Sequence, residues 1–184
     1  MRLFTALLIP DELREHLVRA MEPLRKKYPG LKWARKDALH ITLNFFGEVE
    51  ERLLPLLESA MESAALRIEA FEMLLRGIGF FPRRSSARVV YLGVEQGGKE
   101  CRELRELIAQ GTAGNISLDR RSFTPHLTLA RVKTRTDLPD PAIESRGLAT
   151  DFTVDRIDLY RSHLKKTGAE YELIRSVPLG SRKG

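Results

Sequence analysis

Apolar and polar residues alternate with a period of two in several short segments of this chain and recur with a period near 3.6 in others. The first pattern is typical of β-strands and the second of amphipathic helices. The two kinds of segment interleave through short connections, and no linker is long enough to separate independent domains. The pattern therefore predicts an α+β fold, in which helices cover one face of antiparallel sheets.

The predicted strands are short segments rich in aliphatic and aromatic residues, at 3–9, 39–46, 68–75, 87–94, 123–132, 152–161 and 171–177. Residues 77–82 contain two glycines and a proline, so we expect a turn region between the third and fourth strands. The last two strands are expected to pair as a closing hairpin through residues 165–168. Residues 134–141 are polar and proline-rich and predict a loop, and residues 181–184 are expected to fray.

Three helices are predicted. The first starts at Pro10 and Asp11, with Asp11 as its candidate N-cap, and the others cover 50–65 and 100–110. Pro23 lies inside the first helix and is expected to kink or split it. The apolar stripe of this helix, which we expect to face inward, consists of Leu13, Leu17, Met21, Leu24 and Tyr28.

The chain has 184 residues, 42% hydrophobic and 30% charged, as in globular proteins. We expect one domain over residues 1–184, made of two intimately packed lobes.

No run approaches the roughly 18 apolar residues of a membrane-spanning helix. Residues 1–10 lack a small-residue cleavage site, so they predict a strand and not a signal peptide. The single cysteine, Cys101, excludes an internal disulfide and fits a reducing cytoplasm. We therefore expect a cytoplasmic protein without membrane contact. A monomer is expected too, although the sequence does not fix the oligomeric state.

The charge of the chain favours a polyanionic partner. The net charge is +6 and the pI is near 9.7, and phosphates attract such a surface without any contact to the bases. An alternative is that the arginine-rich composition reflects the genome or a thermal habitat, which the small number of Asn and Gln residues also fits. Charge alone leaves both interpretations open.

Almost the same four residues occur twice. His40-Ile41-Thr42-Leu43 recurs as His126-Leu127-Thr128-Leu129, with the two histidines 86 positions apart. In a strand, the His and the Thr of each copy point to one face and the aliphatic residues to the other. A polar pair on an otherwise apolar strand indicates a lined cleft. Two such pairs, one in each half of the chain, indicate a cleft shared by two similar lobes.

Two imidazoles suit the cleavage of a phosphodiester, because near neutral pH one can be neutral while the other is charged. Repulsion between two imidazolium groups separates their titrations and yields one base and one acid. The Thr of each motif can donate its hydroxyl to a phosphate oxygen. Arg131 could neutralise charge in the transition state. Strict alternation places it opposite His126, so it reaches the cleft only if the strand ends or bulges near Ala130.

A structural role and a metal-binding role of the histidines both fit the sequence less well. A lone His on a strand is more often a structural residue, but a repeated motif favours function. A zinc ion would lack ligands here, because no motif carboxylate or second cysteine completes a set. We therefore expect neither a metal nor a cofactor.

The remaining candidates are less specific. His16 and His163 are expected to be solvated or structural. Trp33 fits a core position or, as an alternative, a platform on which a base stacks. The arginines of one predicted loop are either solvated or guide RNA: Arg83, Arg84 and Arg88.

Two segments carry a family resemblance. His40-Ile-Thr-Leu-Asn-Phe-Phe-Gly47 and Phe123-Thr-Pro-His-Leu-Thr-Leu-Ala-Arg131 resemble the 2H phosphoesterase superfamily, and within it the RNA 2′,3′-cyclic phosphodiesterases once called 2′-5′ RNA ligases. Weaker signatures extend the resemblance over nearly the whole chain: residues 4–7, Trp33, residues 79–82, residues 88–93, residues 159–162, Gly168 and Tyr171.

The resemblance implies a bilobal α+β fold with pseudo-two-fold symmetry. It implies metal-independent hydrolysis of a 2′,3′-cyclic phosphate at an RNA end to a 2′-phosphate. The sequence does not identify the natural substrate, and tRNA fragments, other RNA ends and a small cyclic nucleotide all stay open. In that assignment His40 protonates the departing 3′ oxygen and His126 activates water, while Thr42 and Thr128 hold the phosphate. The residue chemistry alone does not decide which histidine is the acid.

Two other functions stay open. A ligase would run the reverse reaction and join a 2′,3′-cyclic end to a 5′-hydroxyl. We expect this activity to be minor, because the chain has no glycine-rich phosphate loop or nucleotidyl-accepting lysine motif to couple ATP. A noncatalytic RNA-binding module would bind with steep salt dependence and tolerate replacement of the histidines.

Overall fold

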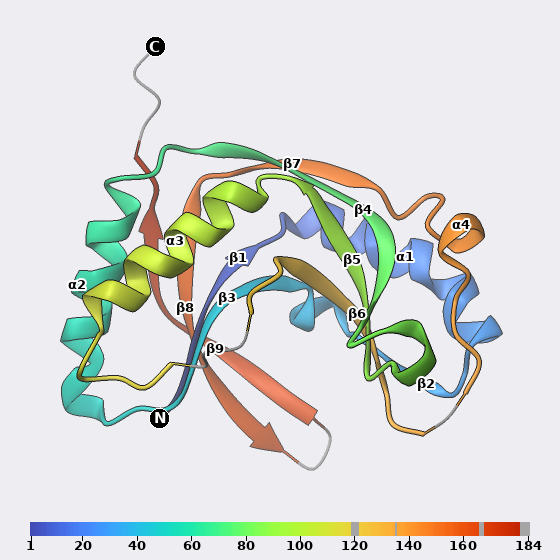
Figure 1. The fold of residues 1–184 in the computed structure, drawn as a ribbon, viewed down its shortest axis with the longest axis horizontal. Helices are drawn as coiled ribbons and strands as arrows, with labels where there is room; N and C mark the ends of the chain where they lie inside the picture. Colours follow the sequence, from blue (N-terminus) through green and yellow to red (C-terminus); the bar gives the residue numbers. More distant parts are fainter. Residues whose placement is uncertain (119–121, 135, 166–167, 181–184) are drawn as a thin grey trace.

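The structure is a computed structural model of the chain and describes residues 1–118, 122–134, 136–165 and 168–180. Its strands form two antiparallel sheets with helices packed along them (Figure 1), which confirms the α+β class. The expected fraying of residues 181–184 lies outside the described residues.

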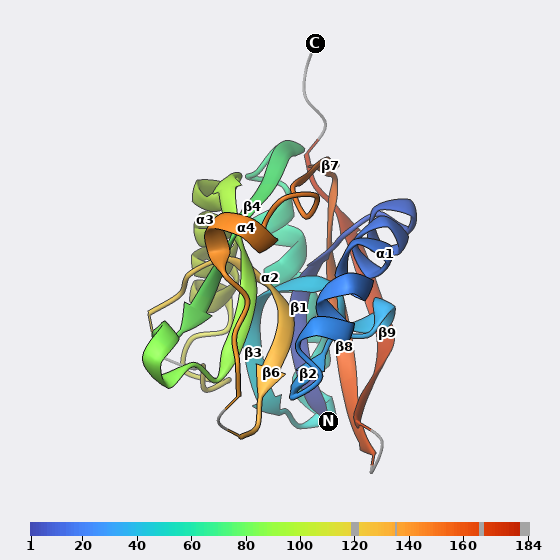
Figure 2. The same cartoon turned by 90° about the vertical axis from the view of Figure 1, so that its right-hand side faces the viewer.

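The two sheets meet at the strands that carry the repeated motif. The first sheet has the order β3-β1-β8-β9, with β1 at Arg2–Leu8, β3 at His40–Glu48, β8 at Arg156–Lys165 and β9 at Gly168–Pro178. The second has the order β2-β6-β5-β4-β7, with β2 at Leu31–Trp33, β4 at Phe71–Phe81, β5 at Val89–Gln96, β6 at His126–Val132 and β7 at Thr150–Val154. The edge strand β3 contacts β6, and Figure 2 shows these strands next to each other.

Helices occupy both ends of the molecule. They are α1 at Asp11–Lys27, α2 at Leu54–Ala65, α3 at Gly98–Gly111 and α4 at Pro141–Glu144, with short 3-10 turns η1 at Lys36–Ala38, η2 at Glu51–Leu53 and η3 at Arg84–Ser86. In Figure 1, α2 and α3 pack together at the left, and α1 and α4 lie at the right. Because α3 contacts both β3 and β5, it connects the two sheets.

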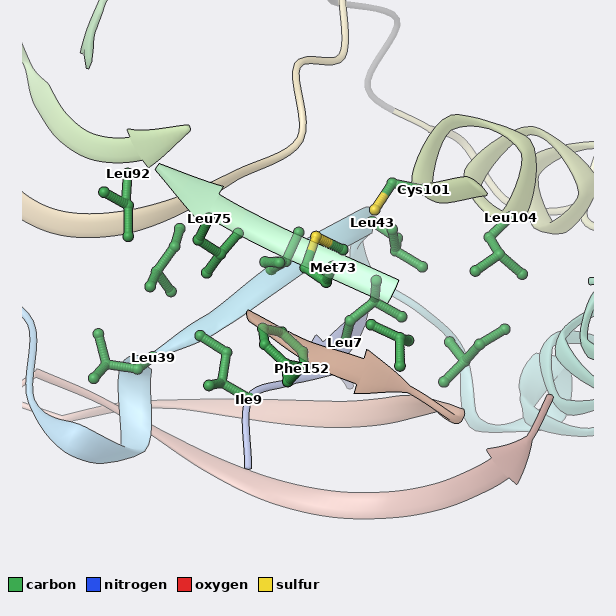
Figure 3. Packing of buried hydrophobic residues seen from close by; sticks show 14 of the residues in the cluster. Leu7, Ile9, Leu39, Leu43, Met73, Leu75, Leu92, Cys101, Leu104 and Phe152 are labelled. Carbon is green, nitrogen blue, oxygen red and sulfur yellow. The ribbon is translucent and has the colours of Figure 1, made fainter. Parts of the chain in front are cut away.

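One continuous hydrophobic core fills the space between the sheets. Leu7 and Leu43 from the first sheet lie in it beside Met73 and Phe152 from the second, and Cys101 joins them from α3 (Figure 3). Removal of these apolar side chains from water is the main favourable contribution to folding. Since the aliphatic motif residues point into this core, the polar motif residues point away from it.

The first helix is continuous through its proline. We expected a kink or a split at Pro23, and the split is wrong, because α1 has no break. Pro23 is exposed, whereas Met21 and Leu24 beside it are buried in the core. Burial of that face outweighs the hydrogen bond that the proline cannot donate.

Asp11 is not the N-cap of this helix. Pro10 occupies that position, and Asp11 is the first helical residue. Its carboxylate accepts hydrogen bonds from Arg14 at 2.7 Å and from Lys36 at 2.8 Å. A carboxylate in the first turn also faces the positive end of the helix dipole, so Asp11 favours the helix start without capping it.

The expected turn at residues 77–82 is also wrong, because β4 runs through most of this segment to Phe81. Gly77 has a φ of +79° and lies at an irregularity of register between Leu75 and Ile78. The glycine therefore serves a bulge inside a long strand, where an L side chain would be strained.

The strand expected over 152–161 is two strands in different sheets. β7 pairs with β4, and β8 pairs with β1 and β9, with Asp155 between them. The alternation breaks at this point, because the buried apolar residues lie at even positions in β7 (Phe152, Val154) and at odd positions in β8 (Ile157, Leu159). The prediction of a single strand passed over this change of phase. The expected hairpin is present as β8 and β9. The sequence did not predict β2, because three residues are too few to show alternation.

Candidate active site

The histidine and the threonine of both motifs line one cavity of about 370 Å³ where the sheets meet. His40 and Thr42 come from β3, and His126 and Thr128 come from β6. All four side chains are partly exposed, so apolar residues do not cover either imidazole completely. β6 begins at His126 itself, three residues later than the alternation suggested.

Each motif strand has a bulge at the same position of the motif. The pairing of β3 with β1 skips Leu43, and the pairing of β6 with β5 skips Leu129. Both leucines are buried. Such a bulge shifts the later residues of a strand by one, so the fifth residue after each histidine turns to the face of that histidine.

The two residues turned in this way are Phe45 and Arg131, and both line the cavity. The condition for Arg131 to reach the cleft, a bulge near Ala130, is therefore met. Phe45 was not a sequence candidate, because strict alternation places it on the face opposite His40. A position-by-position comparison of the two copies would have paired it with Arg131.

A hydrogen bond and two aromatic rings hold His126. Its Nδ1 atom lies 2.7 Å from the carbonyl oxygen of Thr124. A carbonyl can only accept, so Nδ1 carries the proton and the neutral ring presents the lone pair of Nε2. Phe81 and Tyr91 contact the ring edge-on, at centroid distances of 4.8 and 5.4 Å. Burial lowers the pKa of His126; the Thr124 carbonyl opposes this effect and the Arg131 charge adds to it.

His40 lies instead among aromatic rings. Phe4 stacks on its imidazole at a centroid distance of 5.0 Å, and Tyr171 approaches edge-on at 5.2 Å. The imidazole makes no hydrogen bond to the described residues. Burial lowers the pKa of His40 to about 4, against a smaller opposite effect of the Asp37 carboxylate. These surroundings favour the neutral ring until an anion approaches.

Cationic side chains surround the cavity. Lys32 of β2 and Arg131 of β6 are direct cross-strand neighbours, and both line it. Like charges directly opposite each other destabilise a sheet, and a bound anion would remove that cost. Arg2 and Arg35 also line the cavity, and no acidic residue does so in the described part of the chain. The site is therefore suited to an anion.

A second cavity, of about 1020 Å³, adjoins the first. The residues that line both cavities are Thr42, Phe45, His126, Thr128 and Arg131. The two cavities therefore meet at the motif residues, and a ligand bound there has room on either side.

The other two histidines lie outside both cavities. His16 is exposed on α1, and Nε2 of His163 lies 2.7 Å from the Glu172 carboxylate across the β8–β9 hairpin. Trp33 lines the first cavity and packs partly against the core, and its Nε1 donates to the carbonyl oxygen of Tyr28 at 3.1 Å.

The structure separates the three loop arginines. Arg88 lines the second cavity, whereas Arg83 and Arg84 are exposed and line neither cavity.

Cys101 is buried in the core, and burial raises the pKa of its thiol to about 12. A thiol in this state is a small apolar core residue and not a nucleophile.

Among the described residues, no group of three or more His, Cys, Asp and Glu side chains is placed to hold a metal ion. In the same part of the chain, no helix has both the length and the apolar character needed to cross a membrane. The expected independence from metal, the monomeric state and the cytoplasmic location stay predictions.

Two antiparallel sheets that each present a His-x-Thr segment to one cationic cleft define the 2H phosphoesterase class of fold and site. The family model for the 2′-5′ RNA ligase superfamily matches residues 9–166, and the chain belongs to that superfamily. The RNA 2′,3′-cyclic phosphodiesterase of Thermotoga maritima is 30% identical over 175 residues, which cover 95% of this chain and 93% of the relative.

Solved structures agree with this assignment. A crystal structure of a Thermus thermophilus protein matches with a TM-score of 0.83 and 30% identity, over 99% of this chain and 100% of the other. Escherichia coli LigT complexed with 3′-AMP matches with a TM-score of 0.72 and 28% identity, over 97% of both chains. The similarity therefore covers both sheets and the cleft between them.

Proposed function

We propose that this protein hydrolyses the 2′,3′-cyclic phosphate at an RNA end to a 2′-phosphate, with His126 as general base and His40 as general acid. The observation that carries the proposal is the pair of imidazoles, one from each sheet, on one cationic cavity. The name of the Thermotoga relative supports the substrate class, and the LigT complex supports a nucleotide ligand.

In the proposed reaction, a water oxygen bonds to phosphorus while the bond from phosphorus to the 3′ oxygen breaks. Nε2 of His126 accepts a proton from the water, and His40 donates a proton to the departing 3′ oxygen. Both histidines then regain their starting protonation states by exchange with solvent. The hydroxyls of Thr42 and Thr128 donate to the nonbridging oxygens, and Arg131 offsets the charge that builds up on them.

The surroundings of the two rings support this division of roles. The Thr124 carbonyl keeps the proton of His126 on Nδ1, which leaves Nε2 as the acceptor. His40 must carry a proton to act as the acid, although burial lowers its pKa to about 4. An anionic phosphate beside the ring raises that pKa, and the stacked face of Phe4 favours a cation. The bound substrate thus favours the protonated form of the acid.

The test is hydrolysis of a dinucleotide that ends in a 2′,3′-cyclic phosphate. His40→Ala and His126→Ala should each lower kcat by about 10²–10⁴, because each removes one proton-transfer group. His16→Ala is the matched control, since His16 is exposed and lies outside both cavities, and it should retain the wild-type rate. Circular dichroism checks that every variant is folded.

Wild-type rates in both motif variants, with the fold intact, would exclude the acid–base pair. If these variants bind RNA with unchanged affinity and the wild type hydrolyses nothing, the protein is instead an RNA-binding module. Joined product from RNA fragments would reveal the reverse reaction, which the same groups can catalyse.

A further inference from the structure

The proposed reaction uses only the part of the second cavity that it shares with the first. Cationic and aromatic side chains that take no part in the proposed chemistry line the remainder: Arg88, Arg105 and Phe123. Phe81, which also contacts His126, lines the same cavity. Within the described ranges no acidic residue lines this cavity either. Cations interleaved with aromatic rings are the combination that binds single-stranded nucleic acid, through its phosphates and its bases respectively.

Arg88 extends from a backbone that is fixed on both sides. Its N–H donates to the carbonyl oxygen of Phe81 at 2.7 Å, and its carbonyl oxygen accepts from the N–H of Val132 at 2.9 Å. The side chain itself is exposed and lines the cavity. A guanidinium that starts from a rigid position and reaches solvent is well suited to contact a phosphate.

Arg105 and Phe123 form a stacked pair in the same cavity. The Arg105 guanidinium carbon lies 5.0 Å from the centroid of the half-buried Phe123 ring. The backbone of Arg105 is held too, because its carbonyl oxygen accepts from the side-chain amide of the buried Asn44 at 3.1 Å. A planar guanidinium and an aromatic ring are both surfaces on which a nucleobase stacks.

The sizes of the two cavities suggest how a substrate is divided between them. At about 370 Å³ the first cavity lies near the lower end of the range for small-ligand sites, and Trp33 and Tyr171 line it, so it suits the single terminal nucleoside. The second, at about 1020 Å³, offers room for more of the chain. The strand continues from the 5′ oxygen of the terminal ribose and not from the cyclic phosphate. With the base in the first cavity and the ribose and its cyclic phosphate where the cavities meet, that 5′ oxygen can lead into the second cavity.

We propose that the second cavity binds the nucleotide on the 5′ side of the cyclic phosphate end, with Arg88 contacting a phosphate of the strand and the Arg105–Phe123 pair supporting its base. This inference rests on the proposed function and specifies its substrate as an oligonucleotide rather than a mononucleotide. The enzyme then recognises an RNA end by its strand as well as by its terminal group.

The experiment compares adenosine 2′,3′-cyclic phosphate with a tetra-adenylate that ends in the same group. Wild-type kcat/KM should be at least about fivefold higher for the tetranucleotide, the contribution of one stacked base. Arg88→Gln and Phe123→Leu should each lower this ratio several-fold. Arg88→Gln should also reduce the slope of log kcat/KM against log salt concentration for the tetranucleotide by about 0.7, one phosphate contact on a single strand.

Arg83→Gln is the matched control, because Arg83 is exposed near the same turn and lines neither cavity. It should keep the wild-type ratio and slope. Equal kcat/KM for the two substrates in the wild type would overturn the inference. So would an Arg83→Gln effect as large as that of Arg88→Gln, since it would indicate general surface charge.

The two proposals fail in different ways. If the second cavity has no role, the mononucleotide is still hydrolysed and the His40 and His126 variants are still inactive. If the proposed function is wrong, neither substrate is hydrolysed. Phe123 is half-buried, so thermal unfolding should accompany the kinetics of its variant, whereas Arg88 is exposed and its variant tests the inference without that concern.

Discussion

At the scale of single residues, His40 and His126 occupy the same position in their motifs but have different surroundings. A backbone carbonyl binds one nitrogen of His126, whereas stacked and edge-on aromatic rings hold His40. The first environment fixes a tautomer, and the second penalises a charge without specifying a tautomer. Identical residue types can therefore take opposite roles in one reaction.

The depressed pKa of His40 has a consequence for stability. A His that titrates near 4 when folded and near 6.5 when unfolded binds fewer protons in the folded state between these values. Stability is therefore lost as the pH falls through this window. Between pH 7 and pH 5, we expect wild type to lose about 1–2 kcal/mol more unfolding free energy than His40→Gln, measured by urea denaturation.

His16→Gln is the control for this measurement, because His16 is exposed on α1. His16→Gln should show the same pH dependence of the unfolding free energy as the wild type. All three proteins have the same carboxylates, so the contribution of carboxylate titration cancels when they are compared. The same pH dependence in wild type and His40→Gln would show that the ring is not desolvated in the folded state.

At the scale of elements, the bulges of β3 and β6 and the strand pair β4–β5 shape the site. The ring of Tyr91 lies across Gly79 of β4, where an added Cβ atom would come within 2.2 Å of it. Tyr91 stacks on Phe81 at 4.2 Å, and both rings contact His126. The glycine thus permits the aromatic packing that positions the histidine.

We expect Gly79→Ala to displace the Tyr91 ring and to lower kcat by about 10- to 100-fold, because small misplacements of a catalytic group are costly. Tyr91→Phe keeps the ring and should stay close to the wild-type rate. The plot of kcat/KM against pH reports the apparent pKa of the base His126. This apparent pKa should also shift in Gly79→Ala, whereas a general loss of stability would leave it unchanged. A wild-type rate in Gly79→Ala would contradict the positioning role.

The positions of most strands and helices were predictable from the sequence, whereas the irregularities within the strands were not. Alternation indicated both motif strands, since it depends on neighbouring residues. The bulges at Leu43 and Leu129 depend on how each strand pairs with a distant one, so the positions of Phe45 and Arg131 could not be derived from the period alone. For the same reason the expected turn at residues 77–82 is part of a continuous strand.

At the scale of the whole molecule, the cleft exists only because two sheets meet. Each sheet contributes one His-Thr pair, and the cations around the cavity come from both, with Arg2 on β1 and Lys32 and Arg131 on the second sheet. The net charge of +6 adds to the attraction that these cations exert on an anion, and it acts on a polyanion such as RNA over a longer range. Neither sheet alone supplies both an acid and a base.

Since the proposed chemistry relies on imidazoles, hydroxyls and a guanidinium, we expect hydrolysis to continue after dialysis against a chelator. The rate in EDTA should stay within about twofold of the untreated enzyme, well short of the losses that follow removal of a proton-transfer group. The measurement uses the same dinucleotide, with and without added divalent cations. Loss of activity in EDTA, restored by one of these cations, would point to metal-assisted hydrolysis instead.

By itself the sequence determined the α+β class, most of the strands and helices, and the two histidine motifs with the chemistry they suit. These properties depend on local periodicity and on residue type, both of which are written in short stretches of chain. Only the tertiary structure decided that the motifs face one cavity, that Phe45 and Arg131 turn toward it, and that a second cavity adjoins it. These features arise from strand pairing and sheet packing between residues far apart in the chain, which no local pattern encodes.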